Sequence, residues 1–222
     1  MYLSDSSRSF LTVDMKAIFL VVPIASLALL SSGQGHGNAF ECKTPEGSEL
    51  QSHLDIIDVF YLELRTLAAR GASYQGHPLG DGGQMYALLF NRSLYDLAKR
   101  EIEKRQTVNP ETYGLFRLES ILDSRHPTFT SVYALAALIR SNRTVLKQVI
   151  YPEATRYGWV EGVIKESKCL VKSVCLFDKK APDDFDIEKI GDKQKCRIGH
   201  DEDCDYVTPA TCKYPLCYIK KK

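Results

Sequence analysis

TPEGSELQSHLDIIDVFYLELRTLAAR, residues 44–70, is the stretch with the clearest structural pattern in the chain. Its apolar residues recur at alternating steps of four and three, which places them on one face of a helix. Thr44 is expected as the N-cap, with Pro45 in the first turn and Glu46 near the positive end of the helix dipole. We therefore expect a long amphipathic helix here, central to the fold.

Other segments also carry helical patterns, separated by short polar or proline-containing breaks. The glycine-rich stretch 71–83 joins two such patterns and matches no phosphate-binding motif, so we interpret it as a flexible connector. The further expected helices span residues 84–105, 110–123 and 130–141, and a fifth begins near 142 and continues past Pro152 toward 174. Because no segment before Cys169 alternates convincingly, the sequence predicts a mainly α fold, a bundle of about five helices.

The N-terminal segment has the composition of a secretory signal. Met15 and Lys16 precede an apolar run at residues 17–30, which is followed by small and polar residues. The run is shorter than the roughly 20 residues that a membrane-spanning helix needs. We expect residues 1–39 to be a signal peptide, cleaved between residues 33 and 39, with Met15 as the functional start. The mature protein is then secreted and keeps no transmembrane segment.

Length and charge set the domain organisation and exclude some partners. Cleavage would leave roughly 185 residues of the 222, enough for one domain with a small appendage. We expect a helical domain at 40–175 and a cysteine-rich C-terminal region at 176–222 packed on it. The net charge is +1, and the basic cluster at 99–105 is interleaved with acidic residues, so nucleic-acid binding is not expected.

All seven cysteines follow the signal segment, and an exported chain is expected to pair them. The disulfide candidates are Cys42, Cys169, Cys175, Cys196, Cys204, Cys212 and Cys217. Because seven is odd, one thiol stays free or joins a second chain in a disulfide-linked dimer. No Cys-x-x-Cys pair occurs and only His200 lies nearby, so no zinc site, other metal site or cofactor is expected.

Two disulfide layouts are open. If the last six cysteines pair among themselves, Cys42 is left for a bond between chains. We favour a bond from Cys42 to Cys169 or Cys175, because it would anchor the mature N-terminus. Closing a loop of that length contributes on the order of 4 to 5 kcal/mol in the chain-entropy model. One of the later cysteines then stays unpaired.

Two sequons, Asn91-Arg92-Ser93 and Asn142-Arg143-Thr144, are candidates for N-glycosylation in a eukaryotic secretory route. Asn142 is expected between two helices and accessible. Asn91 is expected inside a helical pattern, where it would have to point outward. We therefore expect a glycoprotein modified at Asn142 in preference to Asn91.

One local motif suggests chemistry. His200 and Asp201 lie between Cys196 and Cys204, and this arrangement resembles the active-site helix of secreted phospholipases A2. The resemblance covers about nine residues and implies His200 as general base and Asp201 as a calcium ligand. The sequence departs from that family because two residues, rather than one, separate Asp201 from Cys204, and no glycine-rich calcium loop precedes them. An EF-hand calcium loop is not expected either, because Asp205 is followed by Tyr206 where such a loop has a glycine.

The leading hypothesis is a secreted, non-enzymatic protein whose surface binds an extracellular protein partner. The alternatives are a helical carrier of a small hydrophobic ligand and a secreted hydrolase that uses His200 and Asp201. A continuous apolar cavity would favour the carrier, a convergent pocket around His200 the hydrolase, and an exposed aromatic patch the binding protein.

Overall fold

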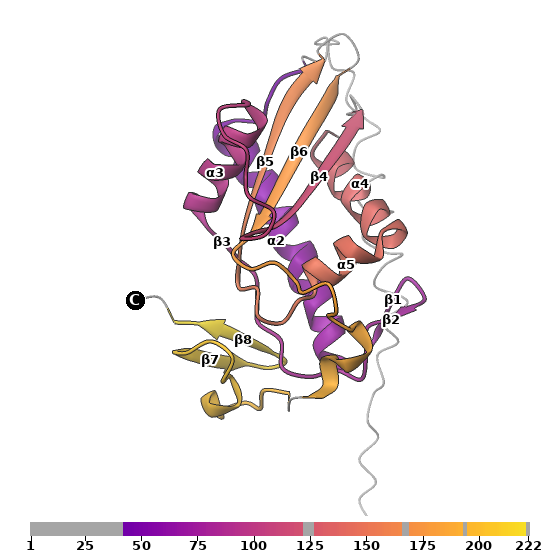
Figure 1. Ribbon diagram of the computed structural model, residues 1–222, viewed down its shortest axis with the longest axis vertical. Coiled ribbons are helices and arrows are strands. Elements are labelled where there is room, and N and C mark those ends of the chain that lie inside the picture. The colour runs from indigo at the N-terminus through magenta and orange to yellow at the C-terminus, as the bar shows by residue number, and fades with distance from the viewer. Residues whose placement is uncertain (1–41, 122–126, 166–168, 193–194, 221–222) are drawn as a thin grey trace, which may run out of the picture. The chain divides into compact units, whose positions relative to one another are not determined.

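The computed structural model describes residues 42–121, 127–165, 169–192 and 195–220. The expected signal peptide, with Met15 and its cleavage region, lies outside these residues. A four-stranded sheet forms the centre of the described part, and helices cover both of its faces (Figure 1). The expectation of a five-helix bundle is therefore wrong, because the described residues form a three-layered α-β-α sandwich.

The described residues contain four α-helices, two short 3-10 helices and eight strands. The helices are α2 (Gly47–Arg70), α3 (Arg92–Ile102), α4 (Pro127–Ser141), α5 (Arg143–Val149), η2 (Ile187–Asp192) and η3 (Asp201–Asp203). The strands are β1 (Ser73–Tyr74), β2 (His77–Pro78), β3 (Leu89–Phe90), β4 (Gly114–Ile121), β5 (Arg156–Lys165), β6 (Leu170–Phe177), β7 (Ala210–Lys213) and β8 (Leu216–Ile219).

The central sheet has the strand order β3-β5-β6-β4. Strand β3 runs parallel to β5, whereas β5 and β4 both pair with β6 in antiparallel fashion. Helix α3 packs on β5 and β6, where Val160, Val174 and Leu176 form a small core with it. The larger core lies on the opposite face, between the sheet and helices α2, α4 and α5.

Helix α2 is the element that the sequence predicts best. It begins at Gly47 rather than at Thr44, and the Thr44 hydroxyl instead accepts a hydrogen bond from the Val163 amide at 3.4 Å. It ends at Arg70, followed by Gly71 in the left-handed region at φ +71°. A Cβ at Gly71 would lie 2.5 Å from the Asp81 backbone, so this position requires glycine both for its φ angle and for space.

Strands replace two of the expected helices. Residues 110–123 contain β4, and the expected continuation from Pro152 to 174 contains β5 and β6. Strands β5 and β6 lie inside a sheet that is covered on both faces, so both of their faces need apolar side chains and an alternating pattern does not develop. Strand β5 is an example, because every residue from Tyr157 to Gly162 is buried.

The second expected helix, 84–105, is only partly present. Asn91 is the N-cap of α3, and the residues before it are extended, with β3 at their end. Helix α3 lies directly against β5, because a Cβ at Gly158 would approach the Tyr95 amide to 2.3 Å. Helix α4 lies close to the position that the sequence predicts, and the residues around the last two cysteines form the short strands β7 and β8.

A buried arginine joins the helical layer to the turn after α5. Arg65 on α2 has no exposed surface, and its guanidinium donates to four backbone carbonyls. The acceptors are Val149 at 2.8 Å, Tyr86 at 2.6 Å, Ala154 at 2.8 Å and Tyr151 at 2.9 Å. Burial lowers the pKa of Arg65 to about 9, so the side chain remains charged at neutral pH.

The cysteine-rich region is part of the same compact unit as the helices and sheet, which spans residues 41–222. The β7–β8 hairpin is joined to the body by two backbone hydrogen bonds of 2.8 Å, from Ala87 to the Cys217 carbonyl and from Cys217 to the Met85 carbonyl. Among the described helices, none has the length and apolar character needed to cross a membrane.

Candidate functional site

An open groove of about 450 Å³ lies where α5 meets the start of β4 and the segment 180–183. We call it the α5 groove. Its apolar lining includes Leu115, Phe116 and Val145, and its basic lining consists of Arg143, Lys147 and Lys180. Asp183 is the one acidic residue in the described lining. The groove therefore combines an apolar surface with an excess of positive charge.

A buried glutamine holds one wall of the α5 groove in place. The Gln148 amide nitrogen donates to the Lys179 carbonyl at 2.9 Å, and its oxygen accepts from the Ala181 amide at 2.8 Å. The side chain passes directly over Gly114, where an added Cβ would lie 2.2 Å from its amide carbon. These contacts fasten the segment 179–181 to α5, so the groove is formed before any ligand binds.

The basic side chains of the α5 groove have only weakly held partners. Lys180 lies 3.3 Å from Glu111 and 3.7 Å from Asp183, and Arg143 lies 3.7 Å from Glu188. The hydrogen bond to Glu111 is the largest cause that raises the pKa of Lys180. All three carboxylate side chains are more than 70% exposed, and such solvent-exposed ion pairs contribute little to stability. A bound acidic group can therefore replace them at little cost.

The candidate catalytic pair has separate partners in the described structure. His200 is exposed, and its Nδ1 lies 2.6 Å from Glu202. Asp201 accepts hydrogen bonds from the Thr211 hydroxyl at 2.7 Å, the Cys212 amide at 3.0 Å and the Lys220 ammonium at 2.9 Å. These bonds, that of Lys220 foremost, lower the pKa of Asp201 to about 2. Asp201 therefore links η3 to β7 and to Lys220, which follows β8.

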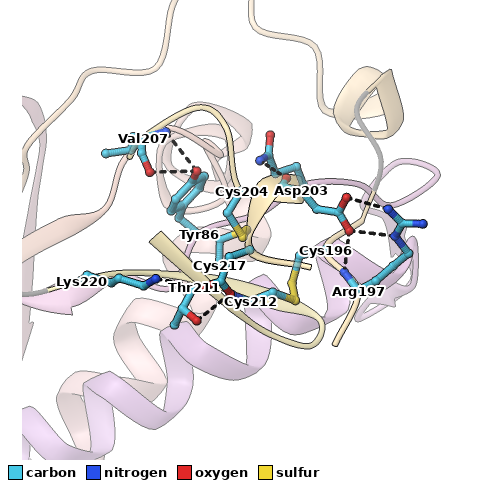
Figure 2. Close-up of a disulfide and its surroundings, with 12 residues drawn as sticks. Tyr86, Cys196, Arg197, Asp203, Cys204, Val207, Thr211, Cys212, Cys217 and Lys220 are labelled. Atoms are coloured by element: carbon cyan, nitrogen blue, oxygen red, sulfur yellow. Dashed lines mark hydrogen bonds and ion pairs between the residues drawn. A yellow bond between two sulfur atoms is a disulfide. The ribbon is translucent and has the colours of Figure 1, made fainter. Parts of the chain in front are cut away.

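Three disulfides join six of the seven cysteines. Cys42 is bonded to Cys169, one of the two bonds favoured from the sequence, and the other bonds are Cys196–Cys212 and Cys204–Cys217. Disulfides persist in oxidising compartments outside the cytosol, and the expected secretion is confirmed. Figure 2 shows the two C-terminal bonds close together beside Tyr86.

The odd cysteine is Cys175 on β6, which is fully buried. Its sulfur lies 3.2 Å from the Tyr61 hydroxyl. Burial raises the pKa of the Cys175 thiol far above its usual range, so the reactive thiolate is suppressed. A thiol in this position is inaccessible to a second chain, which leaves the disulfide-linked dimer without a suitable cysteine among the described residues.

Both sequon asparagines are helix N-caps. The Asn91 side-chain oxygen accepts from the Leu94 amide at 3.0 Å, so Asn91 precedes α3 rather than lying inside a helix. The Asn142 oxygen accepts from the amides of Thr144 and Val145 at 3.0 and 3.2 Å. A glycan would be attached to the amide nitrogen and would leave this oxygen free to cap. Asn142 is exposed and Asn91 is partly buried, and glycosylation of either stays a prediction.

Sequence reasoning did not single out the lining of the α5 groove. Lys147, Lys180 and Leu115 lie in three separate segments, and only the sheet topology brings them together. No local signal marks them, because isolated lysines and leucines are common in every soluble chain. The stretch Lys179-Lys180-Ala181-Pro182, within the charged segment after β6, was the nearest available indication.

The sequence matches no family model and no curated protein. Several solved structures do match. The Ancylostoma-secreted protein Ac-ASP-7 is 24% identical with a TM-score of 0.61, over 84% of this chain and 94% of that chain. Its manganese-bound form is 25% identical with a TM-score of 0.60, over 84% and 93%. BmVAL-1 is 14% identical with a TM-score of 0.62, over 80% and 98%.

These neighbours are venom allergen-like (CAP) domains built as α-β-α sandwiches. The present chain has the same fold. The likeness covers at least 93% of each of these three chains and at least 80% of the present one. The shared fold also explains why the predicted helical bundle is wrong. The helices of this sandwich pack on a sheet rather than mainly on one another.

Proposed function

We propose that this secreted protein acts without catalysis and uses the α5 groove to bind a segment of an extracellular protein. The segment we expect carries a large apolar side chain next to acidic residues. The observation that carries the proposal is the composition of the groove, in which Leu115, Phe116 and Val145 lie beside three basic side chains. Such a lining matches an apolar anchor with a complementary charged rim.

The shape of the groove favours a peptide over a small apolar molecule. The α5 groove is open to solvent. Two smaller grooves are open as well, one between β2, α4 and η2 and one beside the turn that follows α5. A carrier would instead enclose most of the surface of its ligand in an apolar cavity. None of these three grooves is an enclosed apolar cavity of this kind, so they give the carrier hypothesis no support.

Catalysis and metal binding are not favoured by the donor groups present. Neither His200 nor Asp201 lines any of the three grooves described, and their partners differ. One neighbour is a manganese-bound protein, but the described residues contain only one group of three candidate ligands, Cys196, Cys204 and Cys217. Their sulfurs are engaged in disulfides, which do not fit a manganese ion with its preference for oxygen.

The proposal can be tested with a displayed library of short random peptides selected on the purified, oxidised protein. We expect enriched peptides to carry an aromatic or aliphatic residue next to Asp or Glu. The double variant Lys147→Glu/Lys180→Glu should weaken their binding at least about tenfold, because two attractions become repulsions. The matched control is Lys99→Glu/Arg100→Glu on the exposed side of α3, which should leave binding unchanged.

The apolar part of the groove needs its own variant. Val145→Asp is unsuitable because Val145 is buried in the main core, so we choose Leu115→Ser, at a partly buried position. Thermal unfolding of each variant establishes that it is folded before binding is measured. Selected peptides that bind the groove variants and the α3 control equally well would refute the proposal, as would a selection with no acidic and apolar consensus.

A further inference from the structure

A second groove, of about 210 Å³, lies between the turn that follows α5 and the cysteine-rich region. Three aromatic side chains line it, Tyr151, Phe185 and Tyr206, together with the carboxylates of Glu153 and Asp186. A proline and an isoleucine complete the described lining, which contains no lysine or arginine. We call this the aromatic groove. It is separate from the α5 groove and shares none of its lining residues.

Buried contacts hold the aromatic residues in position. The hydroxyl of Tyr86 donates to the Val207 carbonyl at 3.2 Å and accepts from the Val207 amide at 2.9 Å, as Figure 2 shows. This pair of bonds fixes the backbone beside Tyr206, whose ring centroid lies 6.5 Å from that of Tyr86. The hydroxyl of a fully buried tyrosine therefore positions one side of the groove.

Side-chain and backbone contacts also hold the opposite side of the aromatic groove in position. The rings of Tyr151 and Phe185 meet edge to face with centroids 5.2 Å apart, and the Phe185 amide donates to the Pro182 carbonyl at 3.0 Å. The Tyr151 carbonyl is one of the four acceptors of Arg65. Because these groups are ordered without a ligand, binding in the groove would carry little additional entropy cost.

The charge around the aromatic groove is negative. Both charged residues of the described lining, Glu153 and Asp186, are acidic, and residues 183–188 contain four acidic residues and no lysine or arginine. One oxygen of Glu153 pairs with Lys179 at 2.8 Å, a hydrogen bond also links Glu153 to the Tyr151 hydroxyl, and Asp186 accepts from the Glu188 amide at 3.1 Å. Each carboxylate keeps further capacity to accept, since it has two oxygens. Burial, with Glu153 nearby, raises the pKa of Tyr151 to about 12, so this hydroxyl stays neutral.

We propose that the aromatic groove binds a small organic ammonium ion, of which choline is the simplest probe. Aromatic rings attract such cations through the negative charge of their faces, and neighbouring carboxylates add to the attraction. A hard metal ion is a poorer match, because it requires several oxygen ligands rather than rings, a proline and an isoleucine. A headgroup that also carries a phosphate is disfavoured, because Glu153 and Asp186 would repel it.

Calorimetric titration of the oxidised protein tests this proposal with three probes. Choline should bind, and its uncharged isostere, in which carbon replaces the quaternary nitrogen, should bind at least about threefold more weakly, since it lacks the cation–π and charge attraction. Phosphocholine should also bind more weakly than choline. Tighter binding of phosphocholine would overturn the assignment of a free ammonium ion and would indicate a zwitterionic lipid headgroup.

Matched variants locate the binding site. Phe185→Leu keeps an apolar side chain but removes a ring, and we expect choline affinity to fall about threefold to tenfold. Tyr206→Phe keeps the ring and should leave the affinity nearly unchanged. Glu153→Gln should weaken binding, whereas Glu111→Gln makes the same change at the α5 groove and should not.

The outcomes that contradict the proposal are distinct. One is equal affinity for choline and the uncharged isostere, and another is equal affinity of the Glu153→Gln and Glu111→Gln variants. Absence of any choline binding at millimolar concentration would also refute it. If Phe185→Leu lowers the unfolding temperature strongly, the Tyr206→Phe and Glu153→Gln comparison still decides, because neither change removes apolar volume from the fold.

Discussion

Arg65 joins helix α2 to three other segments of this protein. It is fully buried, and its four acceptors lie on the segment before β3, at the end of α5 and in the following turn. Arg65→Met would remove the donor of three buried carbonyls, and the fourth, that of Tyr151, would keep only the Ala154 amide at 3.2 Å. We expect a loss of about 3 to 5 kcal/mol of unfolding free energy. Urea denaturation of the parent protein and the variant measures this loss of unfolding free energy.

The control for Arg65 lies on the same helix. Arg70→Met removes a charge from the exposed end of α2 and should change the unfolding free energy by less than about 0.5 kcal/mol. Equal destabilisation by the two substitutions would show that the four carbonyl contacts do not form.

Asp201 gives a second residue-level prediction, concerned with pH. Its folded pKa of about 2 lies below the ordinary value of 3.8, so the folded state binds fewer protons than the unfolded state between these values. The stabilisation is complete above about pH 4 and is lost as the pH falls toward 2. Asp201→Asn should abolish this part of the acid dependence, measured by thermal unfolding across that range.

Asp184→Asn is the matched substitution for Asp201, because Asp184 is exposed and lies outside the hairpin. It should leave the acid dependence as in the parent protein. Identical acid profiles for the parent and Asp201→Asn would contradict the contacts to Thr211, Cys212 and Lys220.

At the level of elements, Asn142 at the start of α5 has two possible roles, as a helix cap and as a glycosylation site, and two substitutions can distinguish them. Asn142→Ala removes both the cap and the sequon, and we expect a cost of about 1 kcal/mol from the cap. Thr144→Ala removes only the sequon and should leave stability nearly unchanged. If Asn142 is glycosylated on secretion from eukaryotic cells, both variants lose the mass of one glycan, as read by mass spectrometry.

Two results would contradict this view of α5. A stability loss in Thr144→Ala as large as that in Asn142→Ala would show that the glycan rather than the cap stabilises the helix. An unmodified parent protein, secreted from the same cells, would show that the Asn142 sequon is not used.

The elements also show which parts of the fold a single sequence can predict. Helix α2 has one apolar face and one solvated face, so its period of 3.6 is visible in the residues from Leu50 to Ala68. Strands β5 and β6 lie between two helical layers, and residues such as Trp159, Val171 and Val174 are buried on both faces. Their apolar runs resemble a buried helix, and the sequence alone does not distinguish the two.

At the level of the whole molecule, one disulfide joins distant parts of the chain. The bond from Cys42 to Cys169 closes a separation of 127 residues. Cys42→Ser/Cys169→Ser should lower the unfolding free energy by on the order of 4 to 5 kcal/mol in the chain-entropy model. Guanidinium denaturation measures the loss, and an unchanged midpoint would contradict an anchoring role.

Distances along the chain also explain why the candidate sites were not predicted. The α5 groove combines β4, α5 and the segment 180–183, and the aromatic groove combines three segments that include Tyr206. Once residues 110–123 are interpreted as a helix, the position of the α5 groove cannot be inferred. The cysteines are different, because their chemistry in an exported chain predicts pairing without any knowledge of the fold.

A peptide map of the native, non-reduced protein tests the central claim most directly, namely that one oxidised unit includes the sandwich and its C-terminal hairpin. The structure predicts linked peptides for Cys42–Cys169, Cys196–Cys212 and Cys204–Cys217, with Cys175 alkylated only after denaturation. A bond from Cys42 to Cys175 or to the C-terminal cysteines, or rapid alkylation of Cys175 in the native protein, would contradict it.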